Sequence, residues 1–311
     1  MLAGTAGALA VLRCRAAAAE ASFPLLRVSI VPIFAVAPQF AADQLGYFAT
    51  EGVATTTQLV QGGAVGIPGL VSGSFDVLYS NSISVLTALE RGIDLRIIAE
   101  ATPITEHPPD PGALLQRKGS GFHSGKDLEG KIIGINARYD IQWLVVQGWV
   151  KKTGGDLDKI NYREVPLPSM LDALKGGQVD AALVLDPFMT VGLGDPNYEL
   201  VGWPLSTTMP GLPSSLWIVS GTEADTKPEI VRAYVRGFLK GVEWVNTHLG
   251  DDDYLRLVAS YTKTDTKLLA KMVAGKTPTA IDVGSIERLV DLMREYGLLK
   301  THFDIREKIF N

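Results

Sequence analysis

The chain of 311 residues has very little chemistry based on cysteine or histidine. It contains one cysteine, Cys14, and four histidines. A single cysteine excludes an internal disulfide and a cysteine-based metal site. The histidines are scattered and never show the short spacing of paired metal ligands; they are His107, His123, His248 and His302. The sequence therefore predicts no metal site and no cofactor.

Basic clusters and long apolar runs are missing as well. Lys and Arg total 29 against 34 Asp and Glu, and the formal net charge of −5 is spread without blocks. This composition argues against a nucleic-acid-binding surface. Beyond the first residues, no apolar run approaches the roughly 18 residues of a membrane span. With 46% apolar residues, the chain is long enough for two domains with substantial cores.

The N-terminus has features of an export signal. A short apolar run, "MLAGTAGALAVL", is followed by Ala19-Glu20-Ala21, and this pattern predicts a signal peptide over residues 1–21 with cleavage before Ser22. The expected basic region is missing. A start site assigned inside a longer leader, such as a twin-arginine leader, would explain this and would place the protein in the periplasm. The alternative is the ordinary N-terminus of a cytosolic protein.

Two kinds of apolar segment alternate along the first hundred residues. Short β-branched segments that end at Pro, Gly or polar residues predict strands, and segments with apolar residues at helical spacing predict helices. The predicted strands of this part are 25–32, 53–60, 76–80 and 94–102. Strands that alternate with helices predict a mostly parallel sheet with helices on both faces.

The alternation stops at "TPITEHPPDPG", which holds four prolines in eleven residues, and then restarts. Further strands are predicted at 131–136, 160–165, 180–188, 198–203 and 216–220. A second Pro- and Gly-rich passage, "PLSTTMPGLPSS", precedes the last of these strands, and residues 226–311 are predicted to be almost entirely helical. The predicted organisation is a first lobe of residues 22–104 and 217–311, a second lobe of residues 112–205, and two crossings, 105–111 and 206–216.

One sequence device occurs twice, once in each predicted lobe. "GSFDVLYSNS" (73–82) and "GGQVDAALVLDPF" (176–188) each place an Asp, Asp76 or Asp180, directly before an apolar strand. These carboxylates are expected to set the entry of the strand through turn hydrogen bonds. Ligands bind at the carboxyl ends of parallel strands. Two facing sheets joined by a two-segment hinge therefore predict a cleft that closes around a ligand.

Several stretches resemble the type II periplasmic substrate-binding proteins of ABC importers. The resemblance is to the nitrate/sulfonate/taurine and thiamine-pyrimidine-precursor group. It rests on "QLGYFATEGV", "LVQGGAVGIPGLVSGSFDVLYSNS", "ALERGIDLRIIAEA", "KDLEGKIIGIN" and "LPSMLDALKGGQVDAALVLDPF". The resemblance spans about residues 27–188 and implies a two-lobed α/β fold, with a mostly parallel sheet in each lobe and a two-segment hinge.

The resemblance implies pocket positions in the first lobe, where strands end or helices begin. They are Phe34, Ala35, Gly62, Gly63, Ala64, Ser80, Asn81 and Ser82. The glycine pair either forms a plain turn or presents backbone N–H groups of a helix start to an anion. The Ser-Asn-Ser segment would cap the next helix, contact the ligand, or do both.

The pocket positions implied in the second lobe and on the return crossing are Arg138, Tyr139, Asp186, Phe188, Ser215 and Trp217. Arg138 is either a bidentate anchor for a carboxylate or sulfonate or a solvated loop residue. Asp186 would accept a hydrogen bond from a ligand or cap the helix that begins at Pro187. Phe188 and Trp217 would contact the ligand or belong to the packing of the core and hinge.

The function that the resemblance implies is solute capture outside the cytoplasm for an ABC importer. The protein would bind a small organic anion by lobe closure, without chemistry, and deliver it as a monomer to a permease in the inner membrane. Arg138 and the aromatic candidates favour an aromatic or heteroaromatic carboxylate, with a sulfonate next.

Two other functions remain open from the sequence. A sensor input would bind the same ligands and dock on a signalling receptor. A pyrimidine-precursor-binding protein or related biosynthetic enzyme is the other; the enzymes of that branch use an active-site histidine and a cysteine-rich motif. The chain has no cysteine cluster and no histidine at a predicted strand end. The sequence therefore predicts a protein that is not an enzyme and has no catalytic residues.

Overall fold

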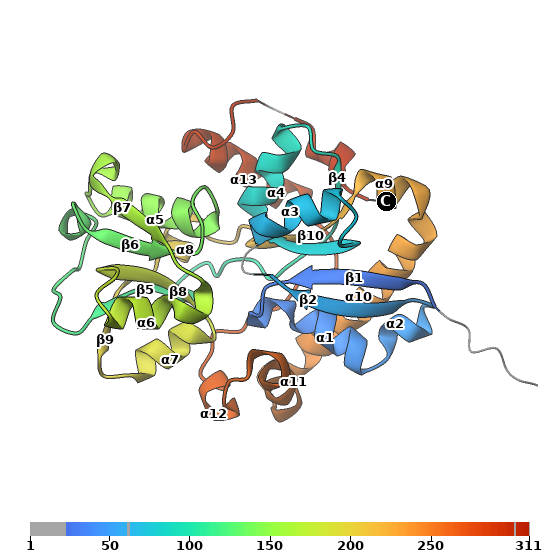
Figure 1. Cartoon of the computed structure of the whole chain (residues 1–311), viewed down its shortest axis with the longest axis horizontal. Coiled ribbons are helices and arrows are strands. Elements are labelled where there is room, and N and C mark those ends of the chain that lie inside the picture. Colours follow the sequence, from blue (N-terminus) through green and yellow to red (C-terminus); the bar gives the residue numbers. More distant parts are fainter. Residues whose placement is uncertain (1–22, 61–62, 302, 311) are drawn as a thin grey trace, which may run out of the picture.

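Two five-stranded sheets form two lobes that lie side by side (Figure 1). The computed structural model describes residues 23–60, 63–301 and 303–310, so the predicted signal peptide of residues 1–21 lies outside the described part. The first sheet has the order β2-β1-β3-β10-β4, formed by β1 (Leu25–Ile30), β2 (Ala54–Leu59), β3 (Val77–Asn81), β4 (Leu95–Glu100) and β10 (Ser215–Ser220). The second has the order β7-β6-β8-β5-β9, formed by β5 (Gly112–Arg117), β6 (Ile132–Ile135), β7 (Asn161–Glu164), β8 (Ala181–Leu185) and β9 (Tyr198–Gly202).

Helices flank both sheets, as the alternation of the sequence predicts. The first lobe carries α1 (Ala37–Gln44), α2 (Tyr47–Thr50), α3 (Gly63–Val71), α4 (Ser82–Glu90), α9 (Gly221–Thr226), α10 (Pro228–His248) and α13 (Val283–Glu295). The second carries α5 (Ile141–Lys152), α6 (Met170–Lys175), α7 (Phe188–Gly194) and α8 (Pro204–Thr208). Single 3-10 turns are η1 (Phe34–Val36), η2 (Lys126–Leu128), η3 (Leu157–Lys159), η4 (Leu167–Ser169) and η5 (Ile305–Lys308). Among these described residues, no helix is both long and apolar enough to cross a bilayer.

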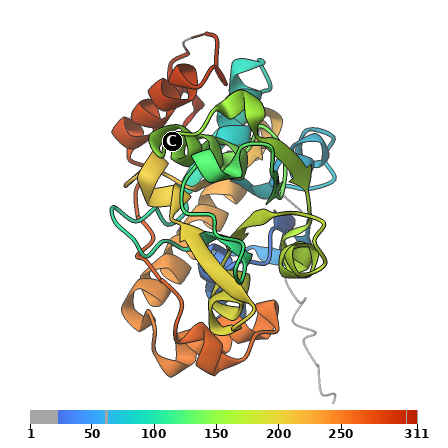
Figure 2. The ribbon, with the colours of Figure 1, turned by 90° about the vertical axis from the view of Figure 1, so that its left-hand side faces the viewer.

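The C-terminal part is less helical than the sequence analysis predicts. After α10 the chain forms α11 (Asp252–Thr262) and the short α12 (Thr266–Leu269), and α12 contacts α7 of the other lobe. Residues 270–282 then run without a helix to α13 at the opposite end of the molecule (Figures 1 and 2). The prediction of almost continuous helix was wrong here, because backbone N–H groups of this segment have partners outside it: that of Val273 interacts with Asp186 of the second lobe, and that of Thr277 donates to Asn246 of α10 (2.9 Å).

Each sheet has one strand that runs against the other four. In the first sheet β1 is parallel to β2 and β3, whereas β10 is antiparallel to β3 and β4. In the second sheet β5 has the same role beside β8 and β9. Both β5 and β10 are the strands that the chain enters after crossing from the other lobe. The two-lobed, mostly parallel prediction is confirmed, although the sequence analysis did not predict β5.

Asp76 and Asp180 hold the amino ends of neighbouring parallel strands in register. The backbone N–H of Asp76 donates to the carbonyl of Arg27 (2.9 Å), and the Arg27 N–H donates back to the Asp76 carboxylate (2.7 Å). Asp180 makes the same reciprocal pair with Ile132 (2.8 and 2.9 Å). Burial favours a raised pKa for Asp76, but the hydrogen bonds from Arg27 outweigh it and hold the pKa below its ordinary value. The repeated Asp therefore fixes the register of two neighbouring strands in each lobe.

The two crossings pair with each other where they pass between the lobes. Ala101 N–H donates to the carbonyl of Ser215 (3.0 Å), and Ile104 N–H donates to that of Leu212 (2.9 Å). Asp110, which is fully buried, accepts from the Ser206 N–H (2.8 Å) and from the Thr105 hydroxyl (3.1 Å). The two-segment connection is therefore a hydrogen-bonded ribbon, which resists twisting more than two independent linkers would.

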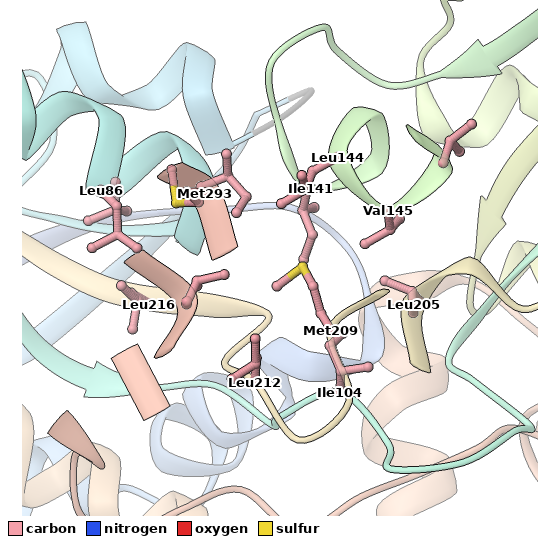
Figure 3. Packing of buried hydrophobic residues seen from close by; sticks show 14 of the residues in the cluster. Leu86, Ile104, Ile141, Leu144, Val145, Leu205, Met209, Leu212, Leu216 and Met293 are labelled. Carbon is pink, nitrogen blue, oxygen red and sulfur yellow. The ribbon is translucent and has the colours of Figure 1, made fainter. Parts of the chain in front are cut away.

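Apolar side chains from both lobes meet beside this ribbon (Figure 3). Ile141 and Leu144 of α5 belong to the same buried cluster as Leu86 of α4 and Met293 of α13, and Met209 of the second crossing is completely buried in it. Burial of apolar surface stabilises by about 25 cal/mol per Å². The cluster therefore favours the arrangement in which the lobes are in contact.

Replacement of Asp76 by Ala removes a charged acceptor and leaves the Arg27 N–H without its partner. Hydrogen bonds to charged groups contribute about 1.5–3 kcal/mol. We therefore expect Asp76→Ala to lower the free energy of unfolding by about 2 kcal/mol in chemical denaturation. Asp225→Ala, at an exposed position of α9, is the matched control and should change it by less than about 0.5 kcal/mol. Equal stability of the two variants would contradict the role of Asp76 in fixing strand register.

Asp140 is the N-cap of α5, and its buried carboxylate makes the stability of the fold depend on pH. Its Oδ1 accepts from the N–H groups of Gln142 (2.9 Å) and Trp143 (3.2 Å), and burial raises its pKa from 3.8 to about 7. The folded state therefore binds a proton that the unfolded state releases, so stability falls as pH rises from about 4 to 7. Asn also caps helices.

We expect the melting temperature of Asp140→Asn minus that of the wild type, measured in calorimetric scans, to increase as pH rises from 4 to 8. Asp140→Ala should instead lose the cap, about 1 kcal/mol, at every pH. A difference between Asp140→Asn and the wild type that stays constant over this range would contradict the raised pKa.

Candidate functional site

A small cavity of about 60 Å³ lies where the facing edges of the two sheets meet. Its lining comes from both lobes and both crossings and consists of Ile33, Phe34, Ala35, Tyr79, Thr102, Pro103, Ile104, Pro111, Ile141, Gln142, Leu185, Asp186, Leu205, Ser214 and Ser215. A cavity of this size has room for roughly four water molecules. A larger solute therefore requires the lobes to separate. None of the described residues that line this interlobe cavity is Lys or Arg.

The first lobe supplies an aromatic wall and hydroxyl groups. Phe34 and Ala35 lie in η1, directly after β1, and Tyr79 lies in β3. Ser215 also lines the cavity, because β10 is antiparallel and begins at the edge where the parallel strands end. Burial raises the pKa of Tyr79 to about 12, although a hydrogen bond with Ser215 lowers it in part. The Tyr79 hydroxyl is therefore neutral at physiological pH.

The second lobe supplies a buried amide that retains an unused donor. Gln142 follows the Asp140 cap and is completely buried. Its Oε1 accepts from the N–H of Asn136 (2.7 Å), which fixes the orientation of the amide. Nε2 has no hydrogen-bond partner among the described residues. An unpaired buried donor costs about 1–3 kcal/mol, which a ligand acceptor would recover.

Asp186 supplies the complementary unused acceptor at the carboxyl end of β8. Its Oδ1 accepts from the N–H (3.0 Å) and hydroxyl (2.7 Å) of Thr190 in α7. Oδ2 is buried and makes no hydrogen bond of normal geometry in the described part of the chain. Burial raises the pKa of Asp186 to about 6, against the hydrogen bonds from Thr190 and a weaker interaction with the backbone N–H of Val273, which lower it. Asp186 therefore caps its helix and also keeps an oxygen available to a ligand.

The interlobe cavity thus combines a donor, an acceptor and apolar walls. A ligand with an N–H or O–H group near a carbonyl or ring nitrogen would complement the unpaired atoms of Gln142 and Asp186. The lining contains no histidine or cysteine, and no nucleophile–base pair occurs among its residues. No group of three metal-ligating side chains occurs in the ranges that the structure describes. The arrangement is suited to binding.

A groove of about 230 Å³ lies on one side of the interlobe cavity. Pro32, Leu59 and Val60 form its first-lobe wall, and Leu167 and Phe188 form part of its second-lobe wall. Phe188, a predicted ligand contact, therefore lines this groove and not the interlobe cavity.

The structure places Arg138 and Tyr139 outside the interlobe cavity lining. The Arg138 N–H donates to the Glu164 carboxylate (2.7 Å), and its guanidinium donates to the carbonyl of Tyr162 (3.0 Å). Tyr139 has a left-handed backbone (φ 58°), is 63% exposed, and its ring lies 5.1 Å from that of Trp143. Arg138 and Tyr139 therefore contact other residues of the second lobe. The geometry does not support Arg138 as a ligand anchor inside the interlobe cavity.

Two residues of the predicted Ser-Asn-Ser segment, Asn81 and Ser82, have structural partners instead of lining the cavity. Asn81 caps α4 by accepting from the N–H of Ser84 (2.9 Å), and the Ser82 hydroxyl donates to the carbonyl of Pro213 (2.7 Å). Ser80 is completely buried and does not line the cavity. Of the alternatives left open by the sequence, helix capping or ligand contact, Asn81 shows helix capping. Ser82 joins the end of β3 to the second crossing.

Trp217 belongs to the core of the first lobe. Its ring is completely buried and lies 5.2 Å from Tyr79 and 4.8 Å from Phe238. Of the two roles that the sequence left open, ligand contact and packing, the geometry therefore corresponds to packing. Of the glycine segment, Gly62 lies outside the described residues, and Gly63 and Ala64 begin α3.

Tyr79, Thr102, Gln142 and Ser214 are polar cavity residues that the predicted site set missed, and Tyr79 and Gln142 carry the argument above. Tyr79 stands one residue before the predicted Ser-Asn-Ser segment, and Gln142 stands three residues after the predicted pocket residue Tyr139. A polar residue inside an otherwise apolar strand or at the buried start of a helix was the available signal. The direction of each side chain depends on sheet register and helix phase, which were not fixed by the pattern.

Comparison with solved structures shows the same two-lobed architecture elsewhere. The alkanesulfonate-binding protein SsuA from Xanthomonas axonopodis pv. citri, bound to MOPS, has a TM-score of 0.76 at 17% identity, covering 92% of this chain and 97% of that one. The periplasmic nitrate-binding protein NrtA from Synechocystis PCC 6803 has a TM-score of 0.77 at 11% identity, covering 92% and 86%. The periplasmic aliphatic sulphonate-binding protein SsuA from Escherichia coli has a TM-score of 0.72 at 16% identity, covering 92% and 97%. At these identities the likeness shows the fold.

The family assignment rests on the sequence itself. No curated protein sequence matches the chain. The profile of the NMT1/THI5-like family matches residues 33–248, which include all strands but β1 and all of the second lobe. The match covers well over half of the 311 residues, and the fold agrees with the periplasmic-binding-protein architecture predicted above. The chain therefore belongs to the NMT1/THI5-like family.

Proposed function

We propose that the protein is the solute-binding component of an ABC importer, acts outside the cytoplasm, and presents its closed, ligand-bound form to a membrane permease. The observation that carries the proposal is the interlobe cavity, to which both lobes contribute an unpaired or neutral polar group. Lobe closure around a solute couples occupancy to shape, which a permease can recognise. The names of the structural neighbours SsuA and NrtA, all binding proteins, support the same class of function.

The ligand that the geometry favours is small, flat and uncharged or cationic, with an N–H or O–H donor beside an acceptor. Asp186 Oδ2 would accept from the donor and Gln142 Nε2 would donate to the acceptor, while Phe34 and Leu185 would cover the apolar faces. Heteroaromatic amines and primary amides have this pattern of polar groups.

The organic anion predicted from the sequence is the second candidate. The neighbours named for sulfonates and nitrate favour it. In the interlobe cavity, however, the described lining offers no cation to an anion, and the ionised Asp186 would repel it. An anion would need the protonated form of Asp186 as a donor, so its affinity would rise as pH falls below about 6, the pKa of Asp186. A ligand N–H donor would show the opposite dependence, because it prefers the carboxylate.

Thermal-shift screening followed by calorimetric titration separates these ligands. The panel holds aminopyrimidines, aromatic amides, aromatic carboxylates, sulfonates and nitrate. A ligand at a hundred times its Kd adds about 2.7 kcal/mol to stability. We expect a neutral or cationic donor–acceptor compound to raise the midpoint, and its affinity to fall below pH 6. Asp186→Asn should weaken it about 10- to 100-fold, since a hydrogen bond to a charged group contributes about 1.5–3 kcal/mol.

The control for this experiment is Arg138→Ala, which removes the candidate anion anchor without touching the interlobe cavity lining. Asn at position 186 can still accept both hydrogen bonds from Thr190, so the fold of Asp186→Asn should be retained. Unchanged affinity in Asp186→Asn together with loss of binding in Arg138→Ala would overturn the assignment and restore the anion anchor.

A further inference from the structure

A second cavity, of about 480 Å³, lies on the first lobe, away from the interlobe cavity. It is bounded by the edge strand β4, by α10, by the segment before α13 and by the C-terminal tail. The tail extends the sheet edge, because the Phe310 N–H donates to the carbonyl of Ile97 (2.9 Å). The walls are mainly apolar and include Ile98, Val235, Leu239, Ile281, Val283 and Ile309. Its size is typical of small-molecule sites.

One buried carboxylate, that of Glu100, belongs to this apolar lining. Glu100 ends β4 and is only 3% exposed. Its Oε1 accepts from the backbone N–H of Asp282 (2.9 Å). Its Oε2 makes no hydrogen bond with any residue that the structure describes. The carboxylate thus has one oxygen that a ligand could use.

The charges around the second cavity leave Glu100 without a cation. Arg306 is the cationic residue of the described lining, and it pairs with Glu287 (2.8 Å) and Asp304 (3.8 Å). Burial, together with the negative charge of Asp282, raises the pKa of Glu100 to about 7, although the Asp282 N–H lowers it in part. A buried carboxylate without a counter-charge is costly. A cation that brings an apolar body into the cavity would relieve that cost.

We propose that this second cavity is a binding site for small organic amines, with the ammonium group on Glu100 and an apolar body between β4 and α10. The site is separate from the interlobe cavity. The two cavities share no lining residue, although they are neighbours along the chain: Thr102, two residues after Glu100, lines the interlobe cavity, and its hydroxyl is hydrogen-bonded to that of Thr277 (2.9 Å), next to Pro278 of the second cavity. The proposal therefore stands or falls independently of the proposed transport function.

The test is calorimetric titration of the full chain with 2-phenylethylamine, against 2-phenylethanol and phenylacetate as neutral and anionic analogues. The amine should bind at least tenfold more tightly than either analogue. Glu100→Gln should weaken the amine at least tenfold and leave the alcohol unchanged. Gln can still accept from the Asp282 N–H, so its melting temperature should not fall, which separates a ligand role from a purely structural one.

Asp186→Asn is the matched control, because the interlobe cavity also holds an unpaired carboxylate oxygen. Amine affinity should be retained in this variant. Loss of amine binding in Asp186→Asn with retention in Glu100→Gln would assign the amine to the interlobe cavity and overturn the second site. Absence of amine binding to the wild type, or equal affinity for amine and alcohol, would also overturn it.

Discussion

The chain crosses twice between the facing edges of two parallel sheets, and this constraint determines the rest of the architecture. A strand entered at that edge must run against its parallel neighbours, and β5 and β10 do so in their respective sheets. Their first residues therefore lie at the edge where the parallel strands end. The lining of the interlobe cavity follows from this arrangement: Asp186 comes from the end of a parallel strand, whereas Ser215 begins an antiparallel one.

Buried carboxylates perform different tasks in this framework according to their partners. Asp76 has a guanidinium and a backbone N–H, and its pKa lies below the ordinary value. Asp140, Asp186 and Glu100 are paired with no cation in the described part of the chain, and burial raises the pKa of each, to about 7, 6 and 7. Asp76 therefore holds strand register. The others keep an unpaired oxygen, which for Asp186 and Glu100 belongs to the lining of a cavity.

The sequence predicted those features that depend on local pattern. Alternating strands and helices, the Asp repeat and the cap at Asn81 follow from periodicity and short-range hydrogen bonding. Strand β5 was missed, because "GALLQR" follows four prolines and is too short to show alternation. Arg138 was expected in the cleft, but its partners Glu164 and Tyr162 lie on β7, more than twenty residues away. Such long-range pairing leaves no local signal in the sequence.

The central claim is that a solute binds between the lobes and is held by Asp186 and Gln142. A crystal structure of the protein with the compound that gives the largest thermal shift tests it most directly. The account predicts ligand density in the interlobe cavity, with a donor on Asp186 Oδ2, an acceptor on Gln142 Nε2 and the ring against Phe34. Density found only beside Arg138 and Tyr139, with the interlobe cavity unchanged, would contradict it.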